Sequence, residues 1–170
     1  MRKAGKAAGP DNIPPETLKA DPNLSSNILH GLFGKIWEEE EMPQDQNESY
    51  IVKLPKKVDS RECKNYRGIS LMSVVGKILK RIILLRLQGA VNATLRDQQA
   101  GFRKDRSCID QIATIRIIIE QSIEWNTSLF FNFVEFEKAF DSLDRSVLWC
   151  LMRHYGIPGR FIRIIKNSYN

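Results

Sequence analysis

The chain has 170 residues, of which 42% are hydrophobic and 27% are charged, and its net charge at pH 7 is +6. This composition is that of an ordinary globular domain, and it excludes a disordered, collagen-like or coiled-coil chain. The longest aliphatic run, residues 82–85, is too short to cross a membrane, and no apolar stretch follows the basic residues near Met1, so we expect neither a membrane span nor a secretory signal.

The first regular element predicted is a helix, which follows a turn and extended stretch rich in Gly and Pro at residues 7–15. Apolar residues at helical spacing predict this helix, with Ser25 or Ser26 as its N-cap and Pro43 as its stop. These residues are Ile28, Leu29, Leu32, Phe33, Ile36 and Trp37. Because four glutamates at 38–41 oppose the helix dipole, we expect this end to fray.

Two short strands and a long helix are predicted next. Residues 50–55 and 66–71 have strand-like patterns, and Lys56, Lys57 and Asp59 are predicted to form the turn between them. The long helix is predicted from a set of apolar residues that share one face, with basic residues elsewhere around it. The apolar face contains Leu71, Val74, Val75, Ile78, Ile82 and Leu85.

Three further helices and one strand are predicted in the second half of the chain. Residues 107–125, 145–156 and 159–169 have helical patterns. The inward face of the first of these is predicted to consist of Ile112, Ile115, Ile119 and Ile123. Residues 129–136 are aromatic and β-branched and apolar on both faces, which predicts a covered central strand. The order of these elements predicts an α+β fold.

The cysteines, Cys63, Cys108 and Cys150, are odd in number and far apart, and the two histidines are also separated. This spacing argues against a zinc site and against a disulfide framework, and it indicates an intracellular protein. The sequence does not distinguish a nuclear from a cytoplasmic location, because no compelling basic targeting run is visible.

The positive charge is concentrated in the middle of the chain. Residues 64–116 hold eleven Lys and Arg against three Asp and Glu, whereas the segments on either side are close to neutral. A segregated basic block is typical of a protein that binds a polyanion. The alternative is a set of solvated helix faces, and charge alone leaves both interpretations open.

Glu135 is the first candidate for chemistry, because it ends the predicted central strand. Strand alternation places it on the same face as Phe131 and Phe133, where a carboxylate needs a cation partner such as Mg²⁺. The alternative is that the strand ends at Val134 and that Glu135 is solvated, and spacing alone favours this alternative.

Residues 133–145, FVEFEKAFDSLDR, resemble the first catalytic box of reverse transcriptases from non-LTR (LINE-type) retrotransposons, in which the family has F-x-D-[FL]-x-K-A-F-D. Four other stretches resemble family boxes in the family order. They are residues 6–14 (the opening box, which begins at Lys6), 50–57 (the first fingers strand), 65–71 (NYRGISL) and 99–108 (QAGFRKDRSC). One such match is weak evidence, but five in order over nearly the whole chain are a strong signal.

This resemblance implies a right-hand polymerase fold, with residues 1–127 as the fingers and residues 128–170 as the start of the palm. The implied reaction is addition of deoxynucleoside triphosphates to a DNA primer on an RNA template, with Mg²⁺ ions activating the primer 3′-hydroxyl and stabilising the leaving pyrophosphate. No membrane is implied as a partner.

The resemblance also implies roles for residues of the catalytic box. Glu135 occupies the position of the family's first metal-binding aspartate, and the backbone carbonyl of Phe136 would help to hold a metal ion. Phe140 matches the family's sugar gate, a ring that would clash with a 2′-hydroxyl, and this role is compatible with a place in the core. Asp141 and Asp144 are expected to be turn and helix-cap residues.

Basic residues of the other boxes are implied to contact phosphates. Arg67, together with Lys53 or Lys56, matches the fingers residues that hold the incoming triphosphate, and Arg suits this task because its planar fork meets phosphate oxygens bidentately. The residues expected along the template backbone are Arg103, Lys104 and Arg106. The alternative for each cation is a solvated surface position.

Three departures from the family pattern bear on activity. Glu135 stands where the family has Asp, and its extra methylene moves the carboxylate by about 1.5 Å. Asn12 stands where the family has Gly, a mild change because Asn tolerates positive φ. The family's second carboxylate box, an aromatic residue followed by x-D-D, has no match in these 170 residues. We therefore expect a fold truncated before that box and a chain that does not polymerise alone.

Three functions are compatible with these observations. The first is a fragment of an RNA-directed DNA polymerase that is inactive as it stands. The second is a non-catalytic nucleic-acid-binding module that uses the basic fingers, with steeply salt-dependent affinity. The third is an interaction or orphan fragment, a non-functional retrotransposon relic, whose exposed strand, residues 130–136, promotes aggregation or partner binding.

Overall fold

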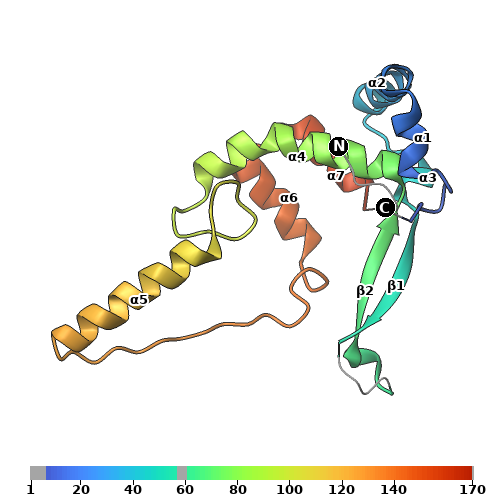
Figure 1. Ribbon diagram of the computed structural model, residues 1–170. Helices are drawn as coiled ribbons and strands as arrows, with labels where there is room; N and C mark the ends of the chain where they lie inside the picture. Colours follow the sequence, from blue (N-terminus) through green and yellow to red (C-terminus); the bar gives the residue numbers. More distant parts are fainter. Residues whose placement is uncertain (1–6, 57–60, 170) are drawn as a thin grey trace.

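The computed structural model describes residues 7–56 and 61–169, and Figure 1 shows the course of the chain. Lys6, Lys57 and Asp59, for which the sequence predicts a motif or a turn, lie outside the described residues. The elements are α1 (Pro15–Ala20), α2 (Pro22–Glu39), α3 (Gln44–Asn47), β1 (Ser49–Pro55), the 3-10 helix η1 (Cys63–Asn65), β2 (Tyr66–Met72), α4 (Val74–Thr94), α5 (Cys108–Glu124), α6 (Arg145–His154) and α7 (Gly159–Asn167).

The long helix α4 runs across the molecule, and the other elements are arranged around it (Figure 1). The elements α1, α2 and α3 lie near its N-terminal end, from which the β1–β2 hairpin projects, and α6 and α7 lie beside it. The fold is α+β, as predicted, and its described residues form one two-stranded sheet. The predicted division into fingers and palm at residue 127 remains a prediction.

The helix α2 begins earlier than the sequence predicts. Asp21 is its N-cap, and the Asp21 carboxylate accepts hydrogen bonds from the backbone N–H groups of Asn23 (3.0 Å) and Leu24 (2.9 Å). The first N–H group of a helix has no hydrogen-bond partner within the helix, and proline has no such group, so Pro22 suits the first helical position. The prediction of Ser25 or Ser26 as the N-cap was therefore wrong, because a better acceptor precedes a proline just upstream.

The predicted strand pair is confirmed as an antiparallel hairpin in which Ser49 pairs with Met72 and Pro55 pairs with Tyr66. Leu71 belongs to β2, not to the long helix as predicted. That helix, α4, begins at Val74 because the buried Ser73 caps it: the Ser73 hydroxyl accepts a hydrogen bond from the Gly76 N–H (2.9 Å) and donates one to Gln46 Oε1 (2.6 Å).

Two hydrophobic clusters lie along α4 and share the helix α7. The first contains the buried Ile36, Leu79 and Ile164, contributed by α2, α4 and α7. The second consists of Leu87, Trp149, Ile157 and Ile162, with Met152 and Phe161 among the partly buried residues around it. Because each buried aliphatic side chain contributes about 1.5–3 kcal/mol, these clusters are the main force that holds the N- and C-terminal segments together.

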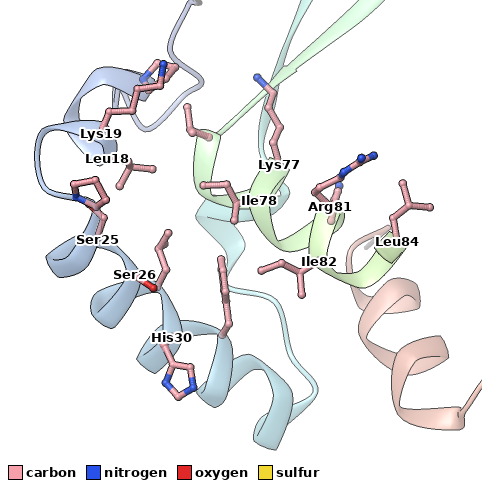
Figure 2. A pocket seen from close by; sticks show the side chains of 16 residues that line it. Leu18, Lys19, Ser25, Ser26, His30, Lys77, Ile78, Arg81, Ile82 and Leu84 are labelled. Carbon is pink, nitrogen blue, oxygen red and sulfur yellow. The ribbon is translucent and has the colours of Figure 1, made fainter. Parts of the chain in front are cut away.

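A groove of about 960 Å³ opens between α1, α2 and the N-terminal half of α4. Figure 2 shows Leu18, Ile78 and Ile82 in this space, with Lys19, Lys77 and Arg81 around it. The sequence does not indicate this groove, because α4 is separated from α1 and α2 by the β1–β2 hairpin and lies beside them only in the folded chain.

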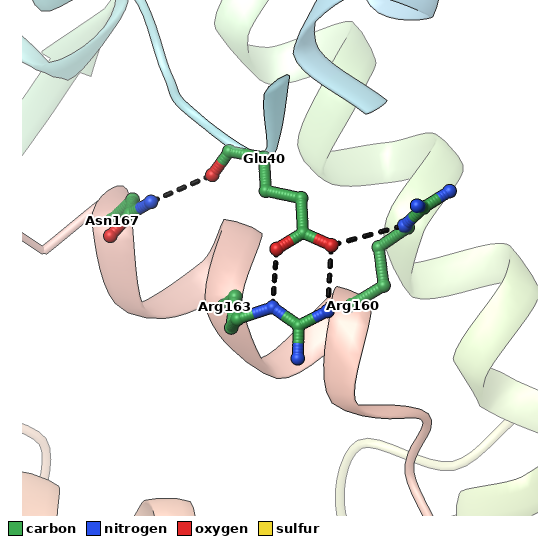
Figure 3. A network of polar contacts seen from close by, with 4 residues as sticks. All are labelled: Glu40, Arg160, Arg163 and Asn167. Carbon is green, nitrogen blue, oxygen red and sulfur yellow. Dashed lines mark hydrogen bonds and ion pairs between the residues drawn. The ribbon is translucent and has the colours of Figure 1, made fainter. Parts of the chain in front are cut away.

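Glu40 joins the C-terminal end of α2 to α7 (Figure 3). Its carboxylate accepts hydrogen bonds from Arg163 and from Arg160 Nε (3.1 Å), while its backbone carbonyl accepts one from Asn167 Nδ2 (2.7 Å). Glu40 has positive φ (60°), and its N–H bonds the Ile36 carbonyl. The expected fraying of this acidic end was wrong, because α7 brings two arginines to the glutamate.

Two further expectations fail in the second half of the chain. The limits of α5 are confirmed, with a capping box between Ser107 and Asp110, but none of its residues is buried, and Ile112 and Ile123 are 65% and 74% exposed. All four isoleucines predicted to face the core, Ile112, Ile115, Ile119 and Ile123, are exposed. Within the part of the chain that the structure describes, no other element covers this helix.

The predicted central strand at residues 129–136 is also absent. These residues are extended but pair with no described strand, and Phe130 and Phe133 are 91% and 83% exposed. The aromatic and β-branched composition sets the extended backbone, whereas a sheet needs a neighbouring strand, which the described residues do not supply. The helices α6 and α7 that follow are confirmed close to their predicted limits.

We predict that Glu40→Gln lowers the urea midpoint of unfolding at pH 7, because it removes the charge that Arg163 and Arg160 bind. The pKa of the Glu40 carboxyl is lowered from 4.5 to about 2, mainly by the hydrogen bond from Arg163 and to a smaller extent by that from Arg160. Folding therefore favours the deprotonated carboxyl, so its contribution is complete above pH 4.5 and is lost as the pH falls towards 2.

The measurement is urea unfolding of both proteins from pH 7 to pH 2, with Glu39→Gln as the matched control, since Glu39 is an exposed neighbour with no ion pair among the described residues. The difference between wild type and Glu40→Gln should shrink below pH 4.5. A difference that is equal for both variants, or that persists unchanged at pH 2, would contradict the role of the Glu40 charge.

Candidate nucleic-acid and nucleotide interface

The β1–β2 hairpin carries three of the cations predicted to contact phosphate. Lys53 lies opposite Gly68 in the register, and Arg67 lies opposite Leu54, so strand alternation places Lys53 and Arg67 on opposite faces of the hairpin. Lys56 follows β1, and its backbone N–H bonds the Asn65 carbonyl (2.6 Å), which continues the strand pairing by one residue. By the same alternation, Lys56 shares a face with Arg67.

The three hairpin cations are exposed. The side chains of Lys53, Lys56 and Arg67 make no hydrogen bond or ion pair with any described residue. A guanidinium and an ammonium on one face of an exposed hairpin can bind successive phosphate oxygens. Of the two lysines left open by the sequence, the geometry therefore favours Lys56 as the partner of Arg67.

Three cations predicted along the template have different surroundings. Arg103 donates from Nη1 to the Arg96 carbonyl (2.8 Å) and from Nη2 to the Asn92 carbonyl (3.2 Å), so it closes the C-terminal end of α4. Arg106 forms an ion pair with Asp97 (3.1 Å), and the exposed Lys104 lies 3.8 Å from Asp105. Arg103 thus has a structural function that the sequence did not reveal, and Lys104 is the most accessible of the three.

The catalytic box itself is open to solvent. Glu135 lies in the exposed extended segment, as does Phe136, whose side chain is 76% exposed. A magnesium site needs several oxygen ligands at one point, and the described residues contain no group of three metal-ligating side chains. The residues present therefore do not fit a metal ion as an assembled site, and no step is assigned to one.

The end of this box forms a turn and a helix cap, as predicted. Asp141 lies in a turn in which its N–H bonds the Lys138 carbonyl (2.8 Å). Asp144 caps α6 and accepts from the Ser146 hydroxyl (2.6 Å), and this hydrogen bond, followed by those from the Val147 and Ser146 N–H groups, lowers the pKa of the Asp144 carboxyl. A carboxylate occupied in this way is a cap and not a free ligand.

Phe140 brings two of the sequence boxes into contact. Its ring meets the ring of Phe102 edge to face, with centroids 5.9 Å apart, although the two side chains are 82% and 96% exposed. Phe102 belongs to the box at residues 99–108, which lies between α4 and α5. The sequence did not indicate this contact, because edge-to-face pairing depends on the path of the chain between the two residues.

The opening box packs against the start of α4. A Cβ atom on Gly9 would lie 2.5 Å from the Ser73 backbone nitrogen, so only glycine fits without a shift of the backbone. Asn12 has a φ of 52°, which confirms that it adopts the conformation for which the family has glycine, and its N–H bonds the Gly9 carbonyl (3.0 Å). The box therefore fixes the approach of the N-terminal segment to the hairpin and α4.

Comparison with known families decides the identity of the chain. The family model described as "Reverse transcriptase (RNA-dependent DNA polymerase)" matches residues 54–169. The chain belongs to this reverse transcriptase family. The match includes three of the five stretches on which the sequence resemblance depended: the second hairpin strand, the box at residues 99–108 and the catalytic box.

Relatives place the chain among the reverse transcriptases of retrotransposons. It is 28% identical over 161 residues to the "Retrovirus-related Pol polyprotein from type-2 retrotransposable element R2DM" of Drosophila melanogaster, covering 95% of the chain and 15% of the relative. It is 29% identical over 164 residues to the "Transposon TX1 uncharacterized 149 kDa protein" of Xenopus laevis, covering 96% and 12%. These matches confirm the resemblance to non-LTR retrotransposon enzymes.

A third relative is the "Probable RNA-directed DNA polymerase from transposon BS" of Drosophila melanogaster, which is 27% identical over 180 aligned residues, covering 97% of the chain and 20% of the relative. The chain thus spans a fifth or less of the length of these three relatives. Among the described residues, no helix is long and apolar enough to cross a membrane.

We predict that Arg103→Ala lowers stability by about 1–2 kcal/mol, because it removes charge-assisted hydrogen bonds to the carbonyls at the end of α4. Lys104→Ala is the matched control: it removes the same charge from the adjacent residue, whose side chain is 73% exposed, and should change stability by less than about 0.5 kcal/mol. Thermal unfolding measures both effects, and equal midpoints for the two variants would contradict the structural function of Arg103.

Proposed function

We propose that these 170 residues are the fingers and the start of the palm of a retrotransposon reverse transcriptase, and that in the whole enzyme they bind the incoming nucleotide and the RNA template. The observation that carries this proposal is the exposed face of the hairpin on which Lys56 and Arg67 lie without partners among the described residues. Both residues belong to stretches that resemble family boxes, and the family model extends over Arg67.

The incoming deoxynucleoside triphosphate is the proposed ligand of Lys56 and Arg67. The planar guanidinium of Arg67 can bind two oxygens of one phosphate, and the ammonium of Lys56 supplies a point charge for the next. Lys53 lies on the other face of the hairpin, where it contacts a different part of the substrate or solvent. Of the two lysines that the sequence leaves open, the proposal therefore takes Lys56.

The RNA template and the DNA primer are the proposed macromolecular partners. Lys104 is the proposed template contact with the fewest internal ties, whereas Arg103 and Arg106 hold the α4–α5 connection in place through bonds to backbone carbonyls and to Asp97. In this arrangement Arg103 and Arg106 position the loop, and their remaining N–H groups face the phosphate backbone. Phe140, in contact with Phe102, is the proposed sugar gate.

These 170 residues alone are not expected to polymerise. The family implies divalent metal use, for which Mg²⁺ is the expected ion, with Glu135 and the Phe136 carbonyl at the family's metal position. Glu135 is exposed, the described residues gather no carboxylate cluster, and no Asp-Asp pair occurs in the sequence. Two-metal chemistry needs ions about 3.5–4 Å apart, which one exposed carboxylate does not position.

A non-catalytic nucleic-acid-binding module is the second candidate, and the same exposed cations favour it. The two candidates differ in whether the longer protein catalyses polymerisation, and they agree in how these residues bind phosphate. Binding by the 170-residue chain supports both candidates, whereas absence of binding supports a relic whose ancestry is that of a polymerase but whose binding surface no longer works.

We predict that the chain binds a labelled RNA–DNA primer–template and that its affinity falls steeply with salt, because Lys and Arg displace counterions from phosphates. Arg67→Ala should reduce the slope of log affinity against log salt by about 1, the change expected for one lost phosphate contact. Fluorescence anisotropy across a salt series measures both quantities.

Lys35→Ala is the control for that series, because it also removes one positive charge, from an exposed residue of α2 away from the hairpin. It should leave the slope unchanged. Equal slopes for wild type, Arg67→Ala and Lys35→Ala would overturn the hairpin as the binding surface, and absence of binding at low salt would overturn the proposed function.

We predict that the 170-residue chain extends no primer in the presence of Mg²⁺, and that Glu135→Asp does not restore extension, because the other carboxylates of a two-metal site are not gathered by the described residues. Primer extension followed on a denaturing gel, with a retroviral reverse transcriptase as the positive control, measures this. Magnesium-dependent product from either chain would contradict the inference.

A further inference from the structure

The groove between α1, α2 and α4 has no part in the function proposed above. It lies at the N-terminal half of α4, on the side of the α1 and α2 helices, and its lining includes none of the cations assigned to phosphate binding (Figure 2). Its volume is about 960 Å³. Open apolar grooves on this scale are typical of sites that receive a partner.

The inside of the groove is apolar. Leu18 of α1 and Ile78 and Ile82 of α4 point into it, and they come from helices that approach from different sides (Figure 2). Leu29 and Phe33 of α2 complete this surface. Ser25, Ser26 and His30 of α2 also belong to the lining and can hydrogen-bond, but most of the surface is hydrocarbon, so the part of a partner that enters the groove is mainly apolar.

The charged residues that line the groove all have the same sign. They are Lys19, Lys77, Lys80 and Arg81, and no Asp or Glu belongs to the lining. Lys77 and Arg81 are four residues apart on α4, beside Ile78 and Ile82, which have the same spacing. An apolar interior with a basic border is complementary to a ligand that has an apolar face bordered by acids.

The dimensions of the groove favour a helix as that ligand. The lining extends along α2 from Pro22 to Phe33 and along α4 from Val74 to Leu84. At 1.5 Å per residue each wall is about 15–17 Å long, which is three turns of an α-helix. A helix of this length presents apolar side chains at positions i, i+4 and i+7, the spacing by which amphipathic helices dock in grooves.

We propose that this groove binds an amphipathic α-helix of a partner protein, whose apolar face enters the groove and whose acidic residues pair with Lys19, Lys80 and Arg81. Nucleic acid fits less well, because its phosphates need dense cations along a polar path, whereas the centre of this surface is hydrocarbon. The site is separate from the hairpin, so it would allow a partner to bind while the phosphate-binding face remains free.

The test uses the full 170-residue chain and a fluorescein-labelled peptide of 14 residues, with leucines at i, i+4, i+7 and i+11 and glutamates on both sides of them. Anisotropy should show saturable binding that weakens with salt. Three control peptides have the leucine order shuffled, the glutamates replaced by glutamines, or the glutamates replaced by lysines. We expect at least fivefold weaker binding for each, and equal binding of the acidic and basic peptides would overturn the proposal.

A pair of charge-reversal variants tests the place of binding. Arg81→Glu changes an exposed residue of the groove, and Lys35→Glu makes the same change on α2 outside the lining. Arg81→Glu should weaken the acidic peptide at least fivefold and strengthen the basic one, whereas Lys35→Glu should change both by less than twofold. Equal effects of the two variants would show non-specific attraction and overturn the site.

Methyl NMR of the isoleucines gives an independent readout of position. Addition of the peptide should shift the signals of Ile78 and Ile82, while those of Ile112 and Ile123, exposed on α5, should stay in place. Shifts confined to α5 would assign the binding to a different apolar surface. Displacement of the peptide by a short RNA, with the same shifts at Ile78 and Ile82, would make the groove a nucleic-acid site and overturn the protein partner.

Discussion

The fold depends on the packing of α7 against α4. Ile162 and Ile164 are only two residues apart in α7, yet each is buried in a different hydrophobic cluster, one around Leu87 and the other around Leu79. Leu79 and Leu87 lie two turns apart on α4, so α7 fastens both halves of the long helix at once. Loss of α7 would remove a buried side chain from each cluster, and about 1.5–3 kcal/mol with each.

The polar contacts of Glu40 become possible only because of this packing. Once Ile164 is in place, Arg160 and Arg163 lie on the same turn of α7, next to the end of α2, where Glu40 accepts from both. Trp37 adds an edge-to-face contact with Phe161 (4.9 Å) and a cation–π contact with Arg160 (5.2 Å). Burial of apolar side chains thus brings α7 against the end of α2, and the charged contacts of Glu40 fix their relative orientation.

The sequence predicted those elements that depend on local information. The hairpin, the limits of α5 and the cap at Asp144 follow from residues within a few positions of one another, and the structure confirms them. Asn12 shows the same rule, because tolerance of positive φ belongs to the residue itself. Features that needed a partner from elsewhere, such as the covered strand at residues 129–136, were not predictable, because helical or strand-like periodicity does not say what lies opposite.

The candidate site shows the same division. The stretch that resembles the catalytic box was recognisable from its sequence alone, and the matched family model extends over it. The geometry of this box could not be predicted from the sequence. Glu135 would need a carboxylate or a cation from another segment beside it, and a single stretch of sequence contains no information about that neighbour. The proposed choice of Lys56 over Lys53 depends on both kinds of information: it is inferred from strand alternation, and that inference requires the register of the hairpin.

The basic middle third of the chain shows how a fold can divide one feature of the sequence among several functions. Eleven Lys and Arg at residues 64–116 suggest a single polyanion surface. In the structure Arg67 faces solvent on the hairpin, Lys77, Lys80 and Arg81 border an apolar groove, and Arg103 and Arg106 bind backbone carbonyls and Asp97. Because charges act over about 8–10 Å in physiological salt, cations spread over separate elements do not add to one potential. The excess therefore supports phosphate binding only where the fold leaves cations exposed and unpaired, and among the assigned residues this condition is met on the hairpin.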